Sequence, residues 1–139
     1  MAITVSKTPK MTRYLVQVER AFAKYPVTII DVGGRGGVNS EWSVFENQAR
    51  IFCFEPDEAE CSRLNESAPE NVTYIPTALG EKTGPATIYE AQLKYSSGLY
   101  ETRMDYFKRF VNWRNGETVG KHQIHVKSLQ DAKIGRAHV

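Results

Sequence analysis

The sequence predicts an α/β fold with a three-layer arrangement around a parallel sheet, and three observations support this prediction. Three short runs rich in β-branched and aromatic residues, at 28–32, 50–54 and 72–75, have the length and composition of strands. Segments with helical patterns separate them, and strands that alternate with helices form parallel sheets with right-handed crossovers. The third observation is a glycine-rich segment, residues 33–37, which follows the first run directly. A loop of this kind joins strand to helix at nucleotide-type cofactor sites.

The bulk composition is that of one soluble globular domain. The chain has 139 residues, of which 41% are hydrophobic and 24% charged. A net charge of +2 does not favour nucleic acid as a partner. No apolar stretch reaches the roughly 20 residues of a membrane span, and the first residues lack the apolar core of a secretory signal. We therefore expect a cytoplasmic protein with no membrane or nucleic-acid partner.

An amphipathic helix is predicted before the first strand. Thr8 has the properties of an N-cap and Pro9 those of a first-turn residue, while Pro26 ends the segment. Apolar residues recur at spacings of four and three, as on one face of a helix: Met11, Leu15, Val18, Phe22 and Tyr25. We expect this face to cover the first strand or the sheet edge; a dimer or substrate surface is the alternative.

Two further helices are predicted between the strands. The first, at 40–48, carries Trp42, Val44 and Phe45, and the second, at 57–64, begins with Asp57 and Glu60 in the pattern of a capping box. The strand between them, at 50–54, is continuously apolar, which is typical of a parallel strand buried on both faces.

The pattern changes after residue 76. Turn-rich residues at 77–84 precede an exposed or edge strand at 85–91 and a polar loop at 95–99. A helix is predicted at 102–113 and a last strand at 123–126. Apolar side chains of that helix share one face, and its aromatic residues are interpreted as a packed face rather than a substrate platform: Met104, Phe107, Phe110, Val111 and Trp113.

Cysteine and histidine residues do not predict a metal site. Cys53 and Cys61 are the two cysteines, without metal-ligand spacing or a disulfide framework, so we expect free thiols. The histidines His122, His125 and His138 have no acidic partner at metal-ligand spacing, so we interpret them as surface or strand residues.

Asp31 and the glycines after it are the first candidate site. Asp31 ends the first strand, where a carboxylate can accept hydrogen bonds from an ammonium or hydroxyl group of a ligand. The glycines let the loop wrap a ligand without side chains in the way: Gly33, Gly34, Gly36 and Gly37. The alternative is a tight strand-to-helix turn without a ligand.

Glu55, at the end of the second strand, is the second candidate. An acidic residue about 20 residues after the glycine loop binds ribose hydroxyls in nucleotide-binding α/β folds. A carboxylate suits two vicinal hydroxyls because it accepts two hydrogen bonds side by side. The alternative is a solvated charge before a helix, but the combination with Asp31 favours the ribose role.

The cofactor chemistry favours S-adenosylmethionine over a dinucleotide. The Gly-x-Gly-x-x-Gly motif of dinucleotide-binding folds is absent. Started at Gly34, the motif requires a third glycine where the chain has Asn39, and started at Gly33 it requires a second glycine where the chain has Arg35. Asp31 would also repel a pyrophosphate, whereas S-adenosylmethionine has no phosphate and carries an ammonium, a sulfonium and a ribose. An NAD(P)-dependent oxidoreductase fragment remains one alternative, and a non-catalytic binding domain is another.

Four segments resemble FkbM-type methyltransferases. They are Ile-Ile-Asp-Val-Gly-Gly-Arg-Gly-Gly, Phe-Glu-Pro-Asp, Thr-Ala-Leu-Gly-Glu-Lys-Thr-Gly and Tyr-Ser-Ser-Gly-Leu, in that order over residues 29–129. The first contains the hydrophobic-hydrophobic-Asp-x-Gly-x-x-x-Gly pattern of class I methyltransferases. The resemblance implies a Rossmann-like class I methyltransferase fold and methyl transfer from S-adenosylmethionine to a hydroxyl oxygen of a sugar, glycan or small metabolite.

The resemblance also implies roles for individual residues. Asp31 and Gly33 would contact the methionine end of the cofactor and Glu55 the ribose. Thr77, Ala78 and Leu79 would edge the adenine pocket. The family usually has Ala-Asn where this chain has Gly34 and Arg35, and we interpret Arg35 as a solvated loop residue. No catalytic base is identified.

The expected organisation is a helical segment at 1–26, a partial methyltransferase domain at 27–132 and a tail at 133–139. Relatives of the FkbM type continue into a fourth strand that pairs with the first, so we expect this chain to be an inactive fragment. We also expect the first strand to have an unpaired edge, which is an aggregation liability. Residues 134–139, Ile-Gly-Arg-Ala-His-Val, match a translation of ATCGGAAGAGCACACGTC, which reads like a sequencing-library adapter. We therefore hypothesise that this tail is not native.

Overall fold

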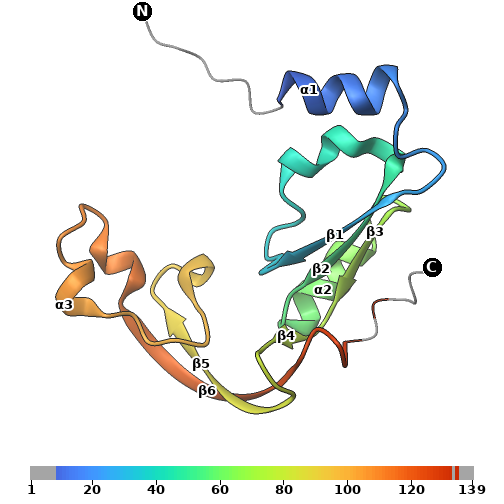
Figure 1. Cartoon of the computed structure of the whole chain (residues 1–139). Coiled ribbons are helices and arrows are strands. Elements are labelled where there is room, and N and C mark those ends of the chain that lie inside the picture. The colour runs from blue at the N-terminus through green and yellow to red at the C-terminus, as the bar shows by residue number, and fades with distance from the viewer. Residues whose placement is uncertain (1–8, 133, 135–139) are drawn as a thin grey trace, which may run out of the picture. The chain divides into compact units, whose positions relative to one another are not determined.

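The structure is a computed structural model that describes residues 9–132 and 134 (Figure 1). The chain divides into two units, Met1–Pro76 and Thr77–Val139. The tail hypothesis concerns residues that lie, apart from Ile134, outside the described part, as does the predicted N-cap Thr8.

The first unit is built on a three-stranded parallel sheet in the order β1-β2-β3. Its strands are β1 (Val27–Val32), β2 (Ala49–Phe54) and β3 (Val72–Ile75). The prediction of a parallel sheet with these three strands is confirmed, to within one residue at each end. In the described part of the chain β1 pairs with β2 alone, with Asp31 opposite Cys53, so its other edge is unpaired.

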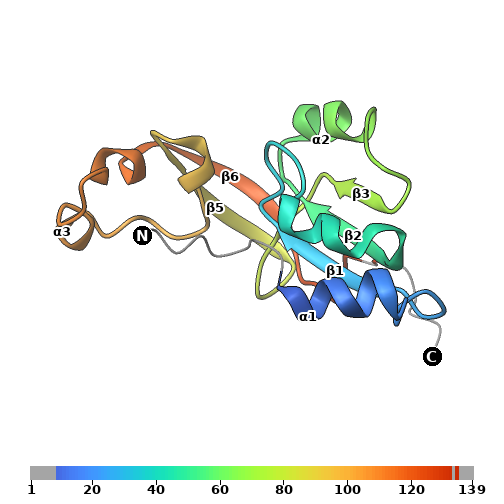
Figure 2. The same ribbon diagram turned by 90° about the horizontal axis from the view of Figure 1, so that it is seen from above.

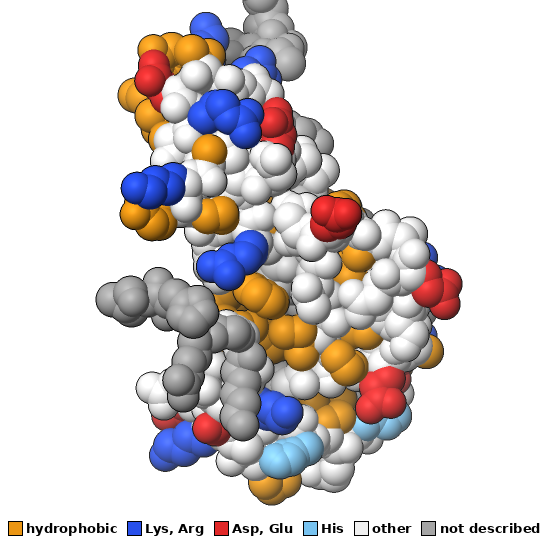
Figure 3. All heavy atoms as spheres, turned by 90° about the vertical axis from the view of Figure 1, so that its right-hand side faces the viewer, with side chains coloured by type: hydrophobic (Ala, Val, Ile, Leu, Met, Phe, Trp, Pro, Cys, Tyr) orange, Lys and Arg blue, Asp and Glu red, His pale blue; other side chains and the backbone are white. Residues whose placement is uncertain are grey.

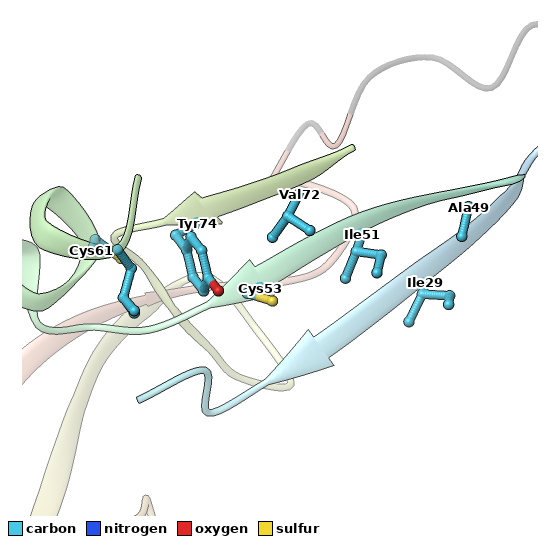
Figure 4. Packing of buried hydrophobic residues seen from close by; sticks show 8 residues of the cluster. Ile29, Ala49, Ile51, Cys53, Cys61, Val72 and Tyr74 are labelled. Atoms are coloured by element: carbon cyan, nitrogen blue, oxygen red, sulfur yellow. The ribbon is translucent and has the colours of Figure 1, made fainter. Parts of the chain in front are cut away.

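Apolar side chains from all three strands form one cluster in this unit (Figure 4). Ile51 and Cys53 of β2 lie between residues of β1 and β3, and α2 (Glu58–Asn65) adds Cys61 and Leu64. Arg50 is exposed, so β2 is not buried on both faces along its whole length. The parallel register, with Val32 opposite Phe54, places the carboxyl ends of β1 and β2 next to each other.

The N-terminal helix is shorter than predicted and buries a different face. It consists of α1 (Lys10–Arg13) and a π-helical turn, η1 (Tyr14–Val18), and Arg20 has a left-handed φ of 47° that prevents continuation. In a π-turn each amide bonds to the carbonyl five residues back, which rotates later side chains off the 3.6-residue stripe. Val16, inside the π-turn, is buried, whereas Met11 and Val18 of the predicted stripe are 72% and 65% exposed.

The helix at 40–48 also differs from its prediction. It is η2 (Ser40–Gln48), two short 3₁₀ pieces joined at Glu46, whose φ of 50° and ψ of −133° are not helical. η2 and α1 lie side by side in two views (Figures 1 and 2). The buried Gln48 side chain joins η2 to the N-terminal segment. Its Nε2 donates to the Val16 carbonyl oxygen at 2.8 Å, and its Oε1 accepts from the Phe22 amide at 3.2 Å.

The second unit contains a sheet in the order β4-β6-β5. Its strands are β4 (Ala78–Leu79), β5 (Gly84–Ala91) and β6 (Thr118–Lys127). β5 and β6 form a long antiparallel ladder, and β4 adds two residues parallel to β6. The predicted strand at 123–126 is therefore part of a longer one. Both described histidines, His122 and His125, are exposed on β6, and histidine side chains are visible in Figure 3.

The predicted helix at 102–113 is wrong. The connection from β5 to β6 contains η3 (Lys94–Ser96), then α3 (Met104–Phe107), and ends in η4 (Trp113–Gly116). The chain turns back on itself after α3, so that a Cβ added at Gly116 would lie 2.7 Å from the Phe107 ring. Phe110 is half exposed but packs its ring against that of Phe107, with 5.7 Å between the ring centroids, whereas Val111 is 97% exposed and lies outside this contact.

Among the described residues, no helix combines the length and apolar character needed to cross a membrane.

Candidate functional site

The glycine loop after β1 is held against the end of β2. The amides of Gly33 and Gly34 both donate to the carbonyl oxygen of Phe54, at 2.8 and 3.1 Å. β1 and β2 are parallel and adjacent, so their carboxyl ends lie at one edge of the sheet. The structure thus brings Asp31, the loop and Glu55 together at the place where open α/β sheets bind ligands.

Two loop positions require glycine for different reasons. A Cβ at Gly34 would lie 3.0 Å from the Cβ of Cys53, so the loop packs directly on β2. Gly37 has a φ of 110°, which L side chains rarely adopt. The next amide, that of Val38, donates to the hydroxyl of Tyr74 at 2.9 Å. The path of the loop is therefore fixed by β2 and β3.

Asp31 is partly buried and contacts the start of η2. Its Oδ2 accepts hydrogen bonds from Trp42 Nε1 at 3.2 Å and from the Asn39 amide at 3.4 Å. Both contacts fall on one carboxylate oxygen, and Oδ1 makes no hydrogen bond to described residues. Asp31 therefore anchors the loop to η2 while presenting a second acceptor. The role of Trp42 was not predicted from the sequence.

Glu55 is 4% exposed, so it is not a solvated charge. Its backbone amide donates to the carbonyl oxygen of Ile75 at 3.1 Å, which extends the pairing of β2 with β3. Its Oε1 accepts from the amide of Asp57 at 3.0 Å. The nearest cation is Arg35, whose Nη2 lies 3.8 Å from Oε1.

Arg35 is an ion-pair residue and not the solvated loop residue expected from the sequence. Its Nη2 lies 2.7 Å from Asp57 Oδ2, and its side chain is 27% exposed. The hydrogen bond to Asp57 raises the pKa of Arg35. The pKa of Asp57 is lowered, first by a hydrogen bond from the Glu60 amide and then by Arg35.

The first turn of α2 also contacts the loop through Glu60. Its Oε1 accepts from the Gly36 amide at 3.0 Å, and Arg63 donates two hydrogen bonds to the same carboxylate. Arg63 and then the Gly36 amide lower the pKa of Glu60 to about 2. Asp57 accepts from the Glu60 amide at 3.1 Å, which confirms the predicted N-cap. The reciprocal half of the predicted capping box is absent, because Glu60 binds Gly36 and the Asp57 amide binds Glu55.

The remaining predicted site residues, Thr77, Ala78 and Leu79, belong to the second unit. Ala78 and Leu79 form β4 and pair with Val126 and Lys127 of β6. Their predicted contact with the adenine of a cofactor stays a prediction.

The two cysteines are buried free thiols, as predicted. Burial, and then the charge of Asp31, raises the pKa of Cys53 to about 12, and burial raises the pKa of Cys61. Thiols with raised pKa values are poor nucleophiles at neutral pH. Within the described residues, no group of three or more His, Cys, Asp or Glu could hold a metal ion.

An open pocket of about 260 Å³ lies beneath η2. Trp42, Ser43 and Glu46 line it from η2, and Ile51, Asn71 and Val72 line it from the sheet side. Neither Asp31 nor Glu55 lines this pocket, but Asn39 and Trp42, which donate to Asp31, do.

Comparisons with known proteins found no match: no family model fits the chain, and no curated protein or solved structure is similar to it. The class of site is therefore defined by the geometry alone. It is a glycine loop between two carboxylates at the carboxyl edge of a parallel sheet in a mixed α/β protein.

Proposed function

We propose that this chain is part of a Rossmann-like, S-adenosylmethionine-dependent methyltransferase that acts on a hydroxyl oxygen of a small-molecule or glycan acceptor. The observation that supports the proposal is the position of Asp31 and Glu55 at the ends of adjacent parallel strands, with the glycine loop tied to β2 between them. The four sequence segments that resemble FkbM-type methyltransferases support it independently.

The residues present fit the polar groups of this cofactor. Oδ1 of Asp31 and Oε2 of Glu55 make no hydrogen bond to described residues, whereas the other oxygen of each carboxylate is engaged. Asp31 would receive the ammonium group and Glu55 a ribose hydroxyl. A Cβ added at Gly33 would meet no atom within 4 Å, so the loop leaves open space for a ligand at this position.

When bound, S-adenosylmethionine supplies an electrophilic methyl group. The chain's own contribution would be positional: the two carboxylates fix the ends of the cofactor, and fixed orientation lowers the barrier for transfer to an acceptor oxygen. No described residue is assigned as the base that accepts the proton of the acceptor hydroxyl.

Ligand titration followed by NMR tests the proposal with the chain as it exists. S-adenosylhomocysteine, NAD⁺ and adenosine are each added to isotope-labelled protein, and the amide signals of the glycine loop are followed. We expect S-adenosylhomocysteine to shift these signals at a lower concentration than the other two. Preference for NAD⁺ would favour the oxidoreductase alternative, and no shift with any ligand would favour a non-catalytic domain.

Two substitutions assign the contacts. Asp31→Asn and Glu55→Gln preserve the side-chain shapes and should each weaken binding of S-adenosylhomocysteine by about 1.5–3 kcal/mol, the range for a hydrogen bond to a charged group. Glu58→Gln on α2 is the matched control, since among the described residues no hydrogen bond or ion pair joins Glu58 to the glycine loop. Unchanged affinity in both site variants would contradict the assignment.

A further inference from the structure

Arg35 links three parts of the candidate site. It projects from the glycine loop, its Nη2 lies 2.7 Å from Oδ2 of Asp57, and the same nitrogen lies 3.8 Å from Oε1 of Glu55. A cation thus joins the loop after β1 to the turn after β2. The loop residues alone could not make this connection, because glycines have no side chain.

The two oxygens of Asp57 have separate partners. Oδ1 accepts from the Glu60 amide and caps α2, whereas Oδ2 accepts from Arg35. The Asp57 amide, in turn, donates to Oε1 of Glu55. Arg35, Asp57 and Glu55 therefore form one connected group of charges, and α2 fixes the position of its central member.

The contacts of Glu55 are asymmetric. Both the Asp57 amide and the Arg35 guanidinium lie on its Oε1 side. Among the described residues no buried side-chain oxygen lacks a hydrogen-bond partner, so Oε2, which has none, is not fully enclosed. The cation and the amide together hold Oε1 toward the protein, which leaves Oε2 as the acceptor available to a ligand.

We propose that Arg35 is a positioning residue: it anchors the glycine loop to Asp57 and orients the Glu55 carboxylate so that Oε2 accepts a hydrogen bond from a ribose hydroxyl. The ribose part of this inference rests on the proposed function. Orientation before binding removes part of the ordering cost, and this raises affinity without a direct contact between Arg35 and the ligand.

A double-mutant cycle distinguishes this role from a loop anchor alone. Arg35→Met should weaken binding of S-adenosylhomocysteine about fivefold to tenfold in the otherwise unchanged chain. In a Glu55→Gln background the same substitution should weaken binding less than about twofold, because the carboxylate that Arg35 orients has been removed. An equal factor in both backgrounds would show that Arg35 holds the loop only, and would overturn the proposal.

Three further variants sharpen the cycle. Asp57→Asn retains a good N-cap for α2 but removes the charge that holds Arg35, so it should weaken binding like Arg35→Met. Arg35→Lys keeps the charge but has no planar fork, so an intermediate affinity is expected. Arg103→Met is the matched control, because it breaks a comparable ion pair, to Asp105 at 2.9 Å, among exposed residues of the second unit. Its affinity should equal that of the unchanged chain.

Amide hydrogen exchange tests the positioning without a ligand. The Asp57 amide donates to Glu55 Oε1, so its exchange rate reports the orientation of that carboxylate. Exchange should be faster in Arg35→Met than in the control Arg103→Met, and an unchanged rate would overturn the inference. If the unchanged chain fails to bind S-adenosylhomocysteine, the proposed function fails, and this exchange experiment still decides whether Arg35 orients Glu55.

Discussion

The two units bury apolar side chains to different extents. In the first, three parallel strands and α2 contribute eight residues to one cluster. In the second, the apolar side chains that are fully buried among the described residues are those of Ala91 and Val126, while Phe110, Val111 and Leu129 are exposed. Since burial of apolar surface is the main stabilising contribution to folding, the first unit should be the more stable by itself.

The difference follows from how each sheet is covered. Helices that connect parallel strands lie against the sheet, and α2 thereby adds Cys61 and Leu64 to the cluster of the first unit. The second unit is mainly a two-stranded ribbon, β5 and β6, and β4 adds only two residue pairs. A two-stranded ribbon is marginally stable in water without a further layer.

The largest expected effect that tests this comparison is Ile51→Ala. Ile51 is buried in the centre of the first cluster, and truncating such a side chain costs about 2–5 kcal/mol. Trp42 reports on the first unit and Trp113 on the second, so urea unfolding is followed by fluorescence in Trp113→Phe and Trp42→Phe backgrounds. We expect the Trp42 transition to move to lower urea and the Trp113 transition to remain.

Ile124→Ala on β6 is the matched control, because it makes the same truncation at a half-buried site of the second unit. Ile124→Ala should lower the urea midpoint of the Trp113 transition. This shift should be smaller than the shift that Ile51→Ala causes in the Trp42 transition. Equal shifts of both transitions in either variant would contradict the comparison, since the chain would then unfold as one cooperative body.

A smaller effect is expected at the glycines. Gly34→Ala places a Cβ 3.0 Å from the Cβ of Cys53, and overpacking of this kind costs about 1–3 kcal/mol. Gly98→Ala in the second unit meets no atom within 4 Å and should change the free energy of unfolding by less than about 0.5 kcal/mol. Urea midpoints measure both, and a neutral Gly34→Ala would show that the loop does not pack on β2 as described.

The strands of the first unit could be predicted because local sequence and tertiary burial favour the same structure there. The β-branched residues of β1 and the apolar run of β2 are also the residues that the sheet buries, such as Ile29 and Ile51. The N-cap Asp57 was predictable for a similar reason, since a cap depends on residues three positions away.

The contacts that complete the site could not be predicted in this way. The bonds from Arg35 to Asp57, from the Gly36 amide to Glu60 and from Trp42 to Asp31 join residues whose proximity depends on the strand pairing. Each side chain has a common local alternative, such as a solvated charge or the capping box expected for Glu60. Similarly, no apolar period marks the π-turn, in which Val16, a residue outside the predicted stripe, is buried.

The smallest expected effect concerns acid and the glycine loop. The pKa of Glu60 is lowered from 4.5 to about 2, chiefly by Arg63 and then by the Gly36 amide. A lowered pKa means that the carboxylate favours the folded state above pH 4.5 and that this contribution is lost as the pH falls toward 2. The Gly36 amide shift should therefore titrate in NMR spectra with a midpoint of about pH 2.

Glu60→Gln should abolish that titration, because the neutral amide keeps an acceptor but has no proton to gain. Glu58→Gln, in the same turn of α2, should leave it unchanged, as should any change confined to the second unit. In the second unit the Ser128 amide donates to the Thr83 hydroxyl, which donates to Asp131. The change of the Ser128 amide shift with pH should be the same with and without Glu60. A Gly36 midpoint near pH 4.5 would contradict the hydrogen bond between the glycine loop and α2.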